Sequence, residues 1–296
     1  MSNGPVDLHI HSSKSSDGDF EPLQLLLQAR QSGFRAIAIS DHDTVDAYPE
    51  AIALSLEAGV ELIPSVELTT VFRDREFHLL LPFVRFDSPV VTDILRRIGS
   101  ARLEEARARV ARLRELGFDI SWDEIVLGSN GSLPLGVTIA RILIDKGRRE
   151  RTPALVPYMT GKNEIFGPYA FYKDYFMEGR PAWVPRRSEN ILDLVPQAAA
   201  DGAVPVLAHP GAYFARAARA DLAELKEAGL AGLEVYSSYH DREQSRAFLA
   251  LADELNLVAT AGSDFHGSIK PHVAFGSVRE GDYGMVEALR RRRRLP

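Results

Sequence analysis

Apolar and polar residues along this chain follow two alternating patterns. Short apolar runs bounded by glycine, proline or polar residues are typical of buried strands, while apolar residues recurring every three or four positions indicate amphipathic helices. The first pattern predicts seven strands, at residues 6–10, 35–40, 61–68, 77–84, 203–210, 232–238 and 257–267. The second predicts helices between most neighbouring strands, at residues 22–33, 48–58, 189–200, 220–229 and 242–255.

This alternation is interrupted between about residues 90 and 184, where only helices are predicted. The stretch "ILRRIGSARLEEARARVARLREL" forms a long charged amphipathic pattern, and shorter helices are expected at "SWDEIV", "VTIARILIDKG" and "FYKDYFMEG". We therefore predict a strand–helix domain formed by residues 1–89 and 185–296, and an all-α insertion formed by residues 90–184.

Strands that alternate with helices form parallel sheets with right-handed crossovers. Seven or eight such units usually close into a barrel, with the chemistry at the carboxyl ends of the strands. An open doubly wound sheet is the alternative, but no G-x-G-x-x-G turn follows the first strand to favour it. The predicted fold is α/β: a distorted, TIM-like (β/α)7 barrel with the all-α insertion after its fourth strand.

Composition narrows the functional classes. With 296 residues, 45% of them hydrophobic, the chain can bury a full core. The absence of cysteine excludes disulfides, cysteine–zinc sites and cysteine nucleophiles. The net charge of −6 disfavours binding of a long nucleic-acid duplex. No apolar run approaches the roughly 20 residues that span a bilayer and no signal peptide is evident, so a cytoplasmic protein without membrane contact is expected.

A basic run, Arg290 to Arg294, lies near the end of the sequence. An RNA-binding tail is one interpretation of this run. The favoured interpretation is the solvated end of a last helix, where cations interact favourably with the helix dipole.

Six of the eight histidines fall near predicted strand ends. His9 and His11 alternate along the first strand, so their side chains share a face. A His-x-His pair alone is weak evidence for a metal, but the same strand ends also carry His42, His78, His209, His266, Asp17, Glu67 and Asp264. Nine nitrogen and oxygen ligands at one rim suit Mn, Fe or Zn.

These residues occur in the motifs "DLHIHS", "SDG", "SDHD", "VEL", "FHLL", "AHPG" and "GSDFH". With them the chain resembles the PHP (polymerase and histidinol phosphatase) superfamily of metal-dependent phosphoesterases, over the whole predicted barrel. The helical insertion and "FYKDYFMEGRPAWVPR" resemble the TrpH-like branch of that superfamily. That branch often carries an Arg-Pro-His stretch where this chain has "LPLGVTIARIL".

The resemblance implies two or three divalent transition-metal ions. By the family pattern the first ion is held by His9, His11, Glu67 and Asp264. Glu67 bridges to a second ion, which His78 and His209 complete, and a third is held by Asp17, His42 and His266. Three divalent ions bring about +6 and three carboxylates about −3, so a phosphate ester and a metal-bridging hydroxide would neutralise the remaining charge of about +3. Asp264 is also the expected catalytic proton carrier.

Other residues have two open interpretations each. Asp7, Asp41 and Asp43 flank the ligands and either orient imidazoles or cap turns. Arg186 is the expected phosphate contact, with Arg141, Lys173 and Arg187 as other candidates, and surface charge is the alternative for each. His240 either meets the substrate or is a solvated loop residue. The insertion's aromatics either stack a base or form its core: Tyr169, Phe171, Tyr172 and Trp183.

The expected function is a metal-dependent phosphoesterase acting on nucleotides, short oligonucleotides or similar small phosphorylated molecules. A phosphatase for a small metabolite such as histidinol phosphate is the alternative. A catalytically silent metal-binding module is less compatible with the complete ligand set. The absence of a strand-end lysine that could be carboxylated weakens an amidohydrolase interpretation.

Overall fold

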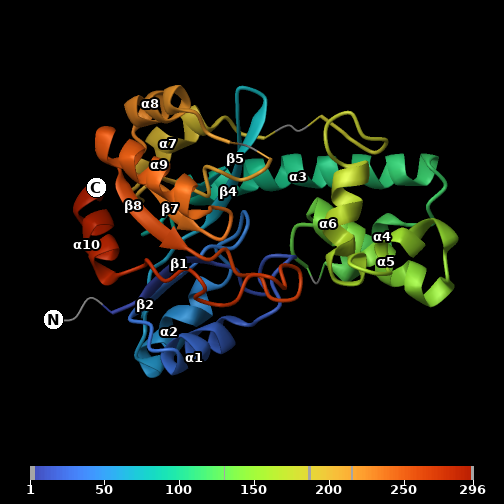
Figure 1. Cartoon of the computed structure of the whole chain (residues 1–296), viewed down its shortest axis with the longest axis horizontal. Coiled ribbons are helices and arrows are strands. Elements are labelled where there is room, and N and C mark those ends of the chain that lie inside the picture. The colour runs from blue at the N-terminus through green and yellow to red at the C-terminus, as the bar shows by residue number, and fades with distance from the viewer. Residues whose placement is uncertain (1–3, 130, 186–187, 215, 295–296) are drawn as a thin grey trace.

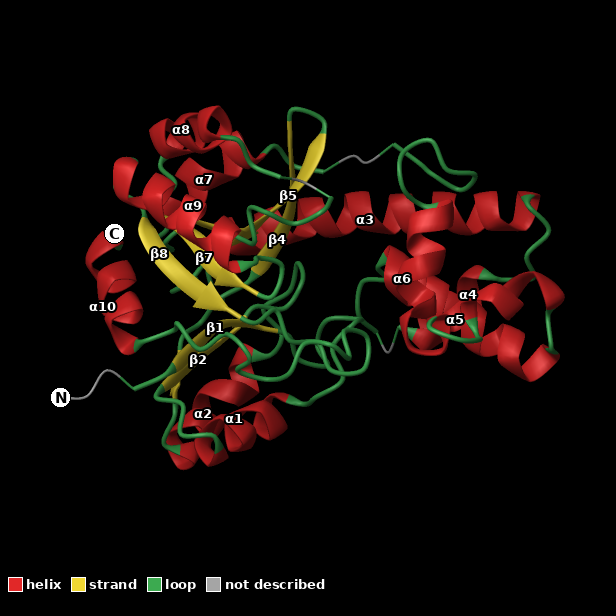
Figure 2. Ribbon diagram, viewed as in Figure 1, coloured by secondary structure: helices red, strands yellow, loops and turns green. Residues whose placement is uncertain are grey.

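The computed structural model describes residues 4–129, 131–185, 188–214 and 216–294, and within them the chain has a mixed α/β fold. Its first sheet holds three parallel strands in the order β1 (Val6–Ile10), β2 (Ala36–Ile39) and β3 (Glu61–Leu62). Each is short and almost wholly buried, as expected for strands covered on both faces. Figure 2 shows the helices that lie against these strands.

The second sheet holds five strands in chain order. They are β4 (Glu67–Phe72), β5 (Arg75–Leu80), β6 (Val206–Leu207), β7 (Gly232–Ser237) and β8 (Val258–Gly262). The pairings of β5 with β4 and with β6 are antiparallel, and the later ones are parallel. Arg73 and Asp74 join β4 to β5 with φ angles of 50° and 60°, the left-handed geometry of a two-residue hairpin turn.

The prediction of seven parallel strands closing into a barrel is therefore confirmed only at the level of an α/β fold with parallel strands. The run at 61–68 is two strands, because Pro64 has no N–H to donate and lies in the break between β3 and β4. Glu67 consequently begins a strand rather than ending one. Isolated bridges, Ile10 to Phe265 and His42 to Glu67, connect the two sheets.

A common core also joins the sheets. Leu8 of β1 and Ala38 of β2 belong to the same buried cluster as Leu80 of β5 and Val206 of β6. Helices cover the outside: α1 (Pro22–Gln31) and α2 (Tyr48–Ala58) beside the first sheet, and α7 (Ile191–Ala200), α8 (Arg219–Ala228) and α9 (Arg242–Glu254) beside the second, as Figure 1 shows.

The basic run near the end begins in the last turn of α10 (Tyr283–Arg292), and Arg293 follows as the C-cap. Arg290 binds Glu61 at 2.6 Å, and Arg292 donates to the carbonyl of Asn256 at 3.0 Å. The helix-end interpretation of this run is confirmed. Across the described ranges, no helix combines the length and apolar character required to cross a bilayer.

The segment between β5 and α7 is helical, as predicted. It contains α3 (Pro89–Glu115), α4 (Trp122–Gly128), α5 (Gly136–Glu150), the 3₁₀ helix η1 (Pro153–Tyr158) and α6 (Asn163–Tyr175). Figure 1 shows α4, α5 and α6 gathered around the end of α3 that is distant from the sheets. The early residues of α3, such as Ile94, pack in the sheet core, while later ones, such as Val110, pack in the helical core. The domain limits stay a prediction.

Phe171 of α6 forms the centre of the helical core. Its side chain is fully buried, and its ring stacks on Tyr175 at 4.3 Å and meets Phe118 and Tyr158 edge-on. We expect Phe171→Ala to lower the free energy of unfolding by about 3–5 kcal/mol, because truncation removes this burial and leaves a cavity. Urea unfolding will measure the loss. Phe166→Ala, on the same helix and 37% exposed, is the control and should cost far less; equal losses would contradict this description of the core.

Candidate metal centre

His9 and His11, one residue apart at the end of β1, point into the same buried space. Their Nε2 atoms lie 3.1 Å apart. Oε2 of Glu67 lies 3.3 Å from His9 Nε2 and 3.2 Å from His11 Nε2. Oδ1 of Asp264 lies 3.4 and 3.1 Å from the same two nitrogens. Strand alternation thus places two imidazoles beside two carboxylates that come from distant parts of the chain.

This spacing suits a shared cation. Ligands about 2.1 Å from a metal ion lie roughly 3.0–3.4 Å from one another around the ion, which is the spacing seen among these four side chains. Among the described residues, Glu67 Oε2 and Asp264 Oδ1 are buried and accept no hydrogen bond. Buried carboxylate oxygens are costly unless paired or bound to a cation. The four ligand atoms therefore fit a divalent metal ion.

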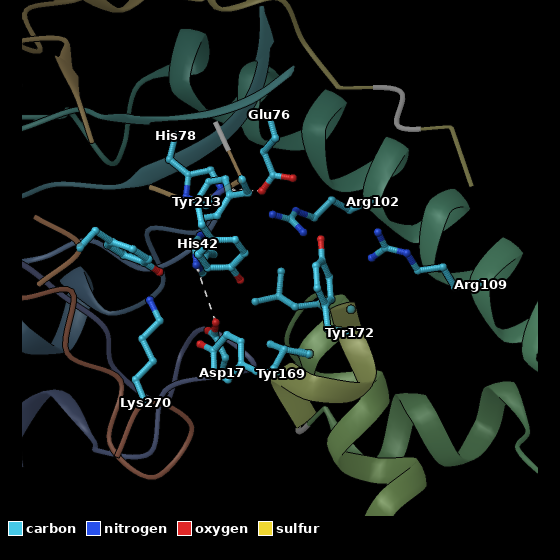
Figure 3. A pocket seen from close by; sticks show the side chains of 15 residues that line it. Asp17, His42, Glu76, His78, Arg102, Arg109, Tyr169, Tyr172, Tyr213 and Lys270 are labelled. Carbon is cyan, nitrogen blue, oxygen red and sulfur yellow. Dashed lines mark hydrogen bonds and ion pairs between the residues drawn. The ribbon is translucent and has the colours of Figure 1, made fainter. Parts of the chain in front are cut away.

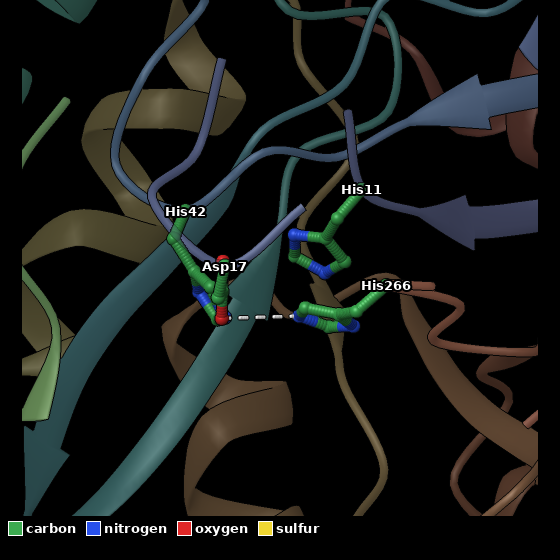
Figure 4. Close-up of side chains that lie close together, drawn as sticks. All are labelled: His11, Asp17, His42 and His266. Atoms are coloured by element: carbon green, nitrogen blue, oxygen red, sulfur yellow. Dashed lines mark ion pairs between the residues drawn. The ribbon is translucent and has the colours of Figure 1, made fainter. Parts of the chain in front are cut away.

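A second group lies next to the first, formed by Asp17, His42 and His266, with His11 beside them. Asp17 Oδ2 lies 3.3 Å from His266 Nε2 and 3.7 Å from His42 Nε2. The His11 and His266 rings stack at 3.8 Å. Figure 4 shows that these side chains, which come from the loops after β1, β2 and β8, turn toward one another.

Glu67 joins the groups, because its two oxygens face different imidazoles. Oε2 faces His9 and His11 and lies 3.0 Å from Nδ1 of His42. Oε1 lies 2.8 Å from Nδ1 of His78 and 3.0 Å from Nε2 of His209. The structure thus brings all nine predicted ligands together, with Glu67 in the position of a bridge.

Several imidazoles are oriented by hydrogen bonds on the side away from the centre. His9 Nδ1 lies 3.0 Å from Glu234 Oε1, His78 Nε2 lies 2.7 Å from Glu76 Oε1, and His266 Nδ1 lies 2.9 Å from the carbonyl of Asp264. Each bond places the proton on the outer nitrogen and leaves the inner nitrogen able to bind a metal.

Glu234 was not identified from the sequence. It is buried on β7, where it also accepts the backbone N–H of His209 at 2.8 Å. The signal was available in "GLEVYSS", because a lone carboxylate within an apolar strand requires a buried partner.

Electrostatics keep the central carboxylates ionised. Burial opposes ionisation of Glu67, but the imidazoles of His42, His9 and His78 hold the pKa of its carboxyl well below its usual range. Burial also opposes protonation of His11, yet its contacts with Asp264 and Glu67 raise its pKa to about 9. Metal binding at His11 would therefore have to displace a proton.

The flanking aspartates bind backbone groups. Asp41 accepts from the backbone N–H and the hydroxyl of Ser12, both at 2.6 Å. Asp7 accepts from the backbone N–H of Ser263 at 2.9 Å, and burial raises the pKa of both aspartates to about 6. Asp43 accepts from the backbone N–H of Thr69 at 2.7 Å. They hold the loops that carry the ligands in place.

The ligand-bearing backbone is closely packed and locally strained. His209 and Asp264 have φ angles of 24° and 56°, in a region that L-residues seldom adopt. A Cβ added at Gly262 would lie 2.3 Å from Cβ of His9 and 2.4 Å from Oε1 of Glu234. Only glycine lets β8 come this close to β1.

A cavity of about 100 Å³ opens onto the centre and is drawn in Figure 3. Asp17, His42 and His78 form its inner wall, and helices α3, α5 and α6 form the outer wall. Its cationic side chains are Arg102, Arg109 and Lys270, and its aromatic ones are Tyr169, Tyr172, Tyr213, Phe214 and Tyr239. Arg102 binds Asp43 and Thr69, and Lys270 binds Asp264.

The sequence did not identify these cations. Arg102 and Arg109 lie within a helix full of arginines, so nothing local distinguishes them from surface charges. Lys270 follows the last ligand motif by only four residues, and its burial is the distinguishing feature.

The predicted substrate contacts Arg141 and His240 do not line the cavity at the metal centre. Arg186 and Arg187 lie outside the described residues. His240 lines a different cavity, where Nδ1 lies 2.8 Å from the carbonyl of Val235 and Nε2 accepts the Gly211 N–H at 2.9 Å. Arg141 donates to the carbonyl of Gly128 at 3.2 Å. The substrate-binding roles of Arg186 and His240 stay predictions.

The aromatics of the insertion divide between the two interpretations. Phe171 belongs to the helical core. Tyr169 and Tyr172 line the cavity at the centre, and Trp183 lines a separate cavity farther out.

Gly262→Ala tests the packing behind the candidate ligands. The added methyl group should displace His9 and Glu234, so we expect Mn²⁺ uptake to fall by at least about tenfold in affinity. Gly99→Ala is the control, because its methyl group would meet only Leu133, at 3.5 Å. Calorimetric titration with Mn²⁺ will measure the affinity and circular dichroism will verify folding. Unchanged affinity in a folded Gly262→Ala protein would contradict the role given to this contact.

Comparison with known proteins agrees with the geometry. Residues 7–115 match the model of the PHP domain. The chain is 26% identical to the 3′,5′-nucleoside bisphosphate phosphatase of Chromobacterium violaceum, over 88% of this chain and 87% of the relative. It is 27% identical to a 5′-3′ exoribonuclease of Haemophilus influenzae, over 88% of this chain and 89% of the relative.

A solved structure is similar in fold over nearly the whole chain. A protein of Bifidobacterium adolescentis, described as a metal-dependent phosphoesterase, superposes with a TM-score of 0.84 at 27% identity, covering 97% of this chain and 96% of the other. The resemblance predicted from the motifs is thereby confirmed: residues 7–115 match the PHP domain, and the fold of the chain is similar to that of a metal-dependent phosphoesterase.

Proposed function

We propose that this protein is a metal-dependent phosphoesterase that hydrolyses phosphate esters of nucleotides or short oligonucleotides. The observation that carries the proposal is the gathering of nine candidate ligands, nearly all buried, in which five imidazoles face the two oxygens of Glu67. The PHP domain and the activities named for the relatives support the same reaction class.

The geometry supports the ligand sets implied by the resemblance. His9, His11, Glu67 and Asp264 would hold one ion. Glu67, His78 and His209 would hold a second, and Asp17, His42 and His266 a third. His42 also lies within ligand distance of Glu67 and His78. His11 likewise lies within ligand distance of the Asp17 group, so each of these two imidazoles lies between two of the proposed metal sites. Mixed nitrogen and oxygen ligation favours Mn, Fe or Zn.

Divalent ions held there would polarise the phosphoryl group and lower the pKa of a bound water. The chain contributes orientation and proton handling. Asp264 directs Oδ1 into the centre while Lys270 binds Oδ2, so Asp264 is placed to exchange a proton with attacking water. Arg102, paired with Asp43, and Arg109, paired with Glu105, line the opposite side of the cavity from α3 (Figure 3).

We further propose that the two sheets act as one distorted barrel and that residues 90–184 form a separate helical domain. The bridges at Ile10–Phe265 and His42–Glu67 and the shared core support the first part. The separate cluster around Phe171 supports the second.

The activity test is a panel of esters assayed with Mn²⁺: nucleoside mono- and bisphosphates, cyclic nucleotides, short RNA and histidinol phosphate. We expect kcat/KM for a nucleoside bisphosphate or short RNA to exceed that for histidinol phosphate by at least about tenfold. Chelation should abolish turnover and Mn²⁺ should restore it. Asp264→Asn should lower kcat by about a thousandfold or more, while Asp253→Asn, on the exposed face of α9, should match the wild type. Preference for histidinol phosphate would favour the metabolite phosphatase instead.

Metal content tests the bridging role of Glu67. Because both of its oxygens face ligand groups, Glu67→Gln should lose about two ions per chain, whereas His78→Ala should lose about one. Elemental analysis of the purified variants will count the ions, and Glu57→Gln, exposed on α2, is the control. Loss of a single ion in both site variants would remove the bridging assignment.

A further inference from the structure

A larger cavity, of about 430 Å³, adjoins the cavity at the metal centre. The linings of the two cavities share Tyr169, Tyr213, Tyr239 and Lys270, so the outer cavity leads directly to the centre. The inner cavity has room for little beyond a phosphate group, and the outer one falls within the size range of small-ligand pockets. Whatever is esterified to the phosphate must extend past these shared residues.

Aromatic and cationic side chains alternate in this outer cavity. Helix α6 and its cap present Lys162, Phe166, Tyr169 and Lys173 at helical spacing, so one face of the helix lines the cavity. Phe166 is 37% exposed and Tyr213 is 53% exposed, although both are large aromatic side chains. Lys173 lies 4.6 Å from the centre of the Tyr213 ring. Exposed rings beside lysines suit stacked bases joined by phosphates.

Charge distinguishes this cavity from a second outer cavity, which opens beyond Arg109, Tyr172 and Phe214 and contains Trp183. The described residues lining the first include Lys162, Lys173 and Lys270 and no carboxylate. The second is lined by Asp74, Glu76 and Glu178 against Arg75 and Arg109. An anionic substrate that leaves the metal centre is therefore attracted toward the lysines and disfavoured on the other side.

We propose that the outer cavity is a nucleobase-binding subsite, in which Phe166 and Tyr213 stack a base while Lys173, beside the Tyr213 ring, contacts the adjoining phosphate. This inference rests on the proposed function and specifies its substrate class: a nucleotide bearing a second phosphate, whether a nucleoside bisphosphate or the end of a short oligonucleotide. A phosphomonoester without a base would leave the cavity empty.

The test compares a 5′-phosphorylated adenylyl dinucleotide with the same backbone lacking both bases. With the Mn²⁺-loaded wild type, kcat/KM should be higher for the dinucleotide. Phe166→Ala and Tyr213→Ala should each lower kcat/KM for the dinucleotide by about 5- to 100-fold more than kcat/KM for the abasic analogue. Both side chains are partly exposed, so the variants should fold normally.

Two matched controls accompany these variants. Trp183→Ala, whose side chain is 38% exposed in the other outer cavity, should change neither substrate. Lys173→Gln should lower kcat/KM for both substrates by a similar factor, because it removes a phosphate contact, and Lys226→Gln on α8 should not. The subsite is refuted if the ratio of kcat/KM for the dinucleotide to kcat/KM for the abasic analogue is the same in the wild type, Phe166→Ala and Tyr213→Ala. It is also refuted if that ratio falls in Trp183→Ala instead.

Calorimetric binding of the two probes to the metal-free full chain separates this inference from the proposed function. Turnover of neither probe by the Mn²⁺-loaded protein would count against the phosphoesterase. Preferential binding of the dinucleotide that Phe166→Ala and Tyr213→Ala abolish would still establish the subsite, and equal binding of both probes by all three proteins would exclude it.

Discussion

The site is built around the burial of one carboxylate, Glu67, among imidazoles. Removing an ionised carboxylate from water is costly unless positive charge surrounds it, and here five histidines supply ring nitrogens to its two oxygens. Protons on the imidazoles can provide that charge only partly, because neighbouring imidazolium ions repel one another. Divalent cations at the same positions would neutralise the carboxylates while using imidazole lone pairs that are otherwise directed at each other.

This requirement explains why the fold is irregular around Glu67. Pro64 ends β3, and β4 then starts at Glu67 and turns back through a tight hairpin, so that Thr69 lies opposite His78. The carboxylate therefore lies beside the loop after β2, which carries His42. A regular parallel strand would have sent the chain away along a helix at this point. The antiparallel hairpin instead returns a histidine to the same carboxylate.

The sequence predicted what local pattern determines. The positions of most helices and strands follow from apolar periodicity, and the nine candidate ligands were selected as polar residues near predicted strand ends, although Glu67 begins β4 and His78 lies within β5. The hairpin at Arg73 and Asp74 was missed, because the turn has no glycine or asparagine to signal its left-handed geometry. Glu234, Lys270 and Arg102 were missed because their partners are distant in the chain: Glu234 meets His9 across 225 positions. Such residues are recognised by burial, which only the folded chain reveals.

Helix α3 connects the helical segment to the sheets. This helix starts in the sheet core and ends in the helical core, so it fixes the insertion relative to the ligands. The insertion also meets the loop after β1, where Ser16 and Thr138 hydroxyls lie 2.9 Å apart and Ser132 donates to the carbonyl of Lys14. That loop carries Asp17. The cavity wall formed by the insertion is thus tied to a loop that carries a candidate ligand, and under the proposed function changes in the insertion would alter which ester fits without altering the centre itself.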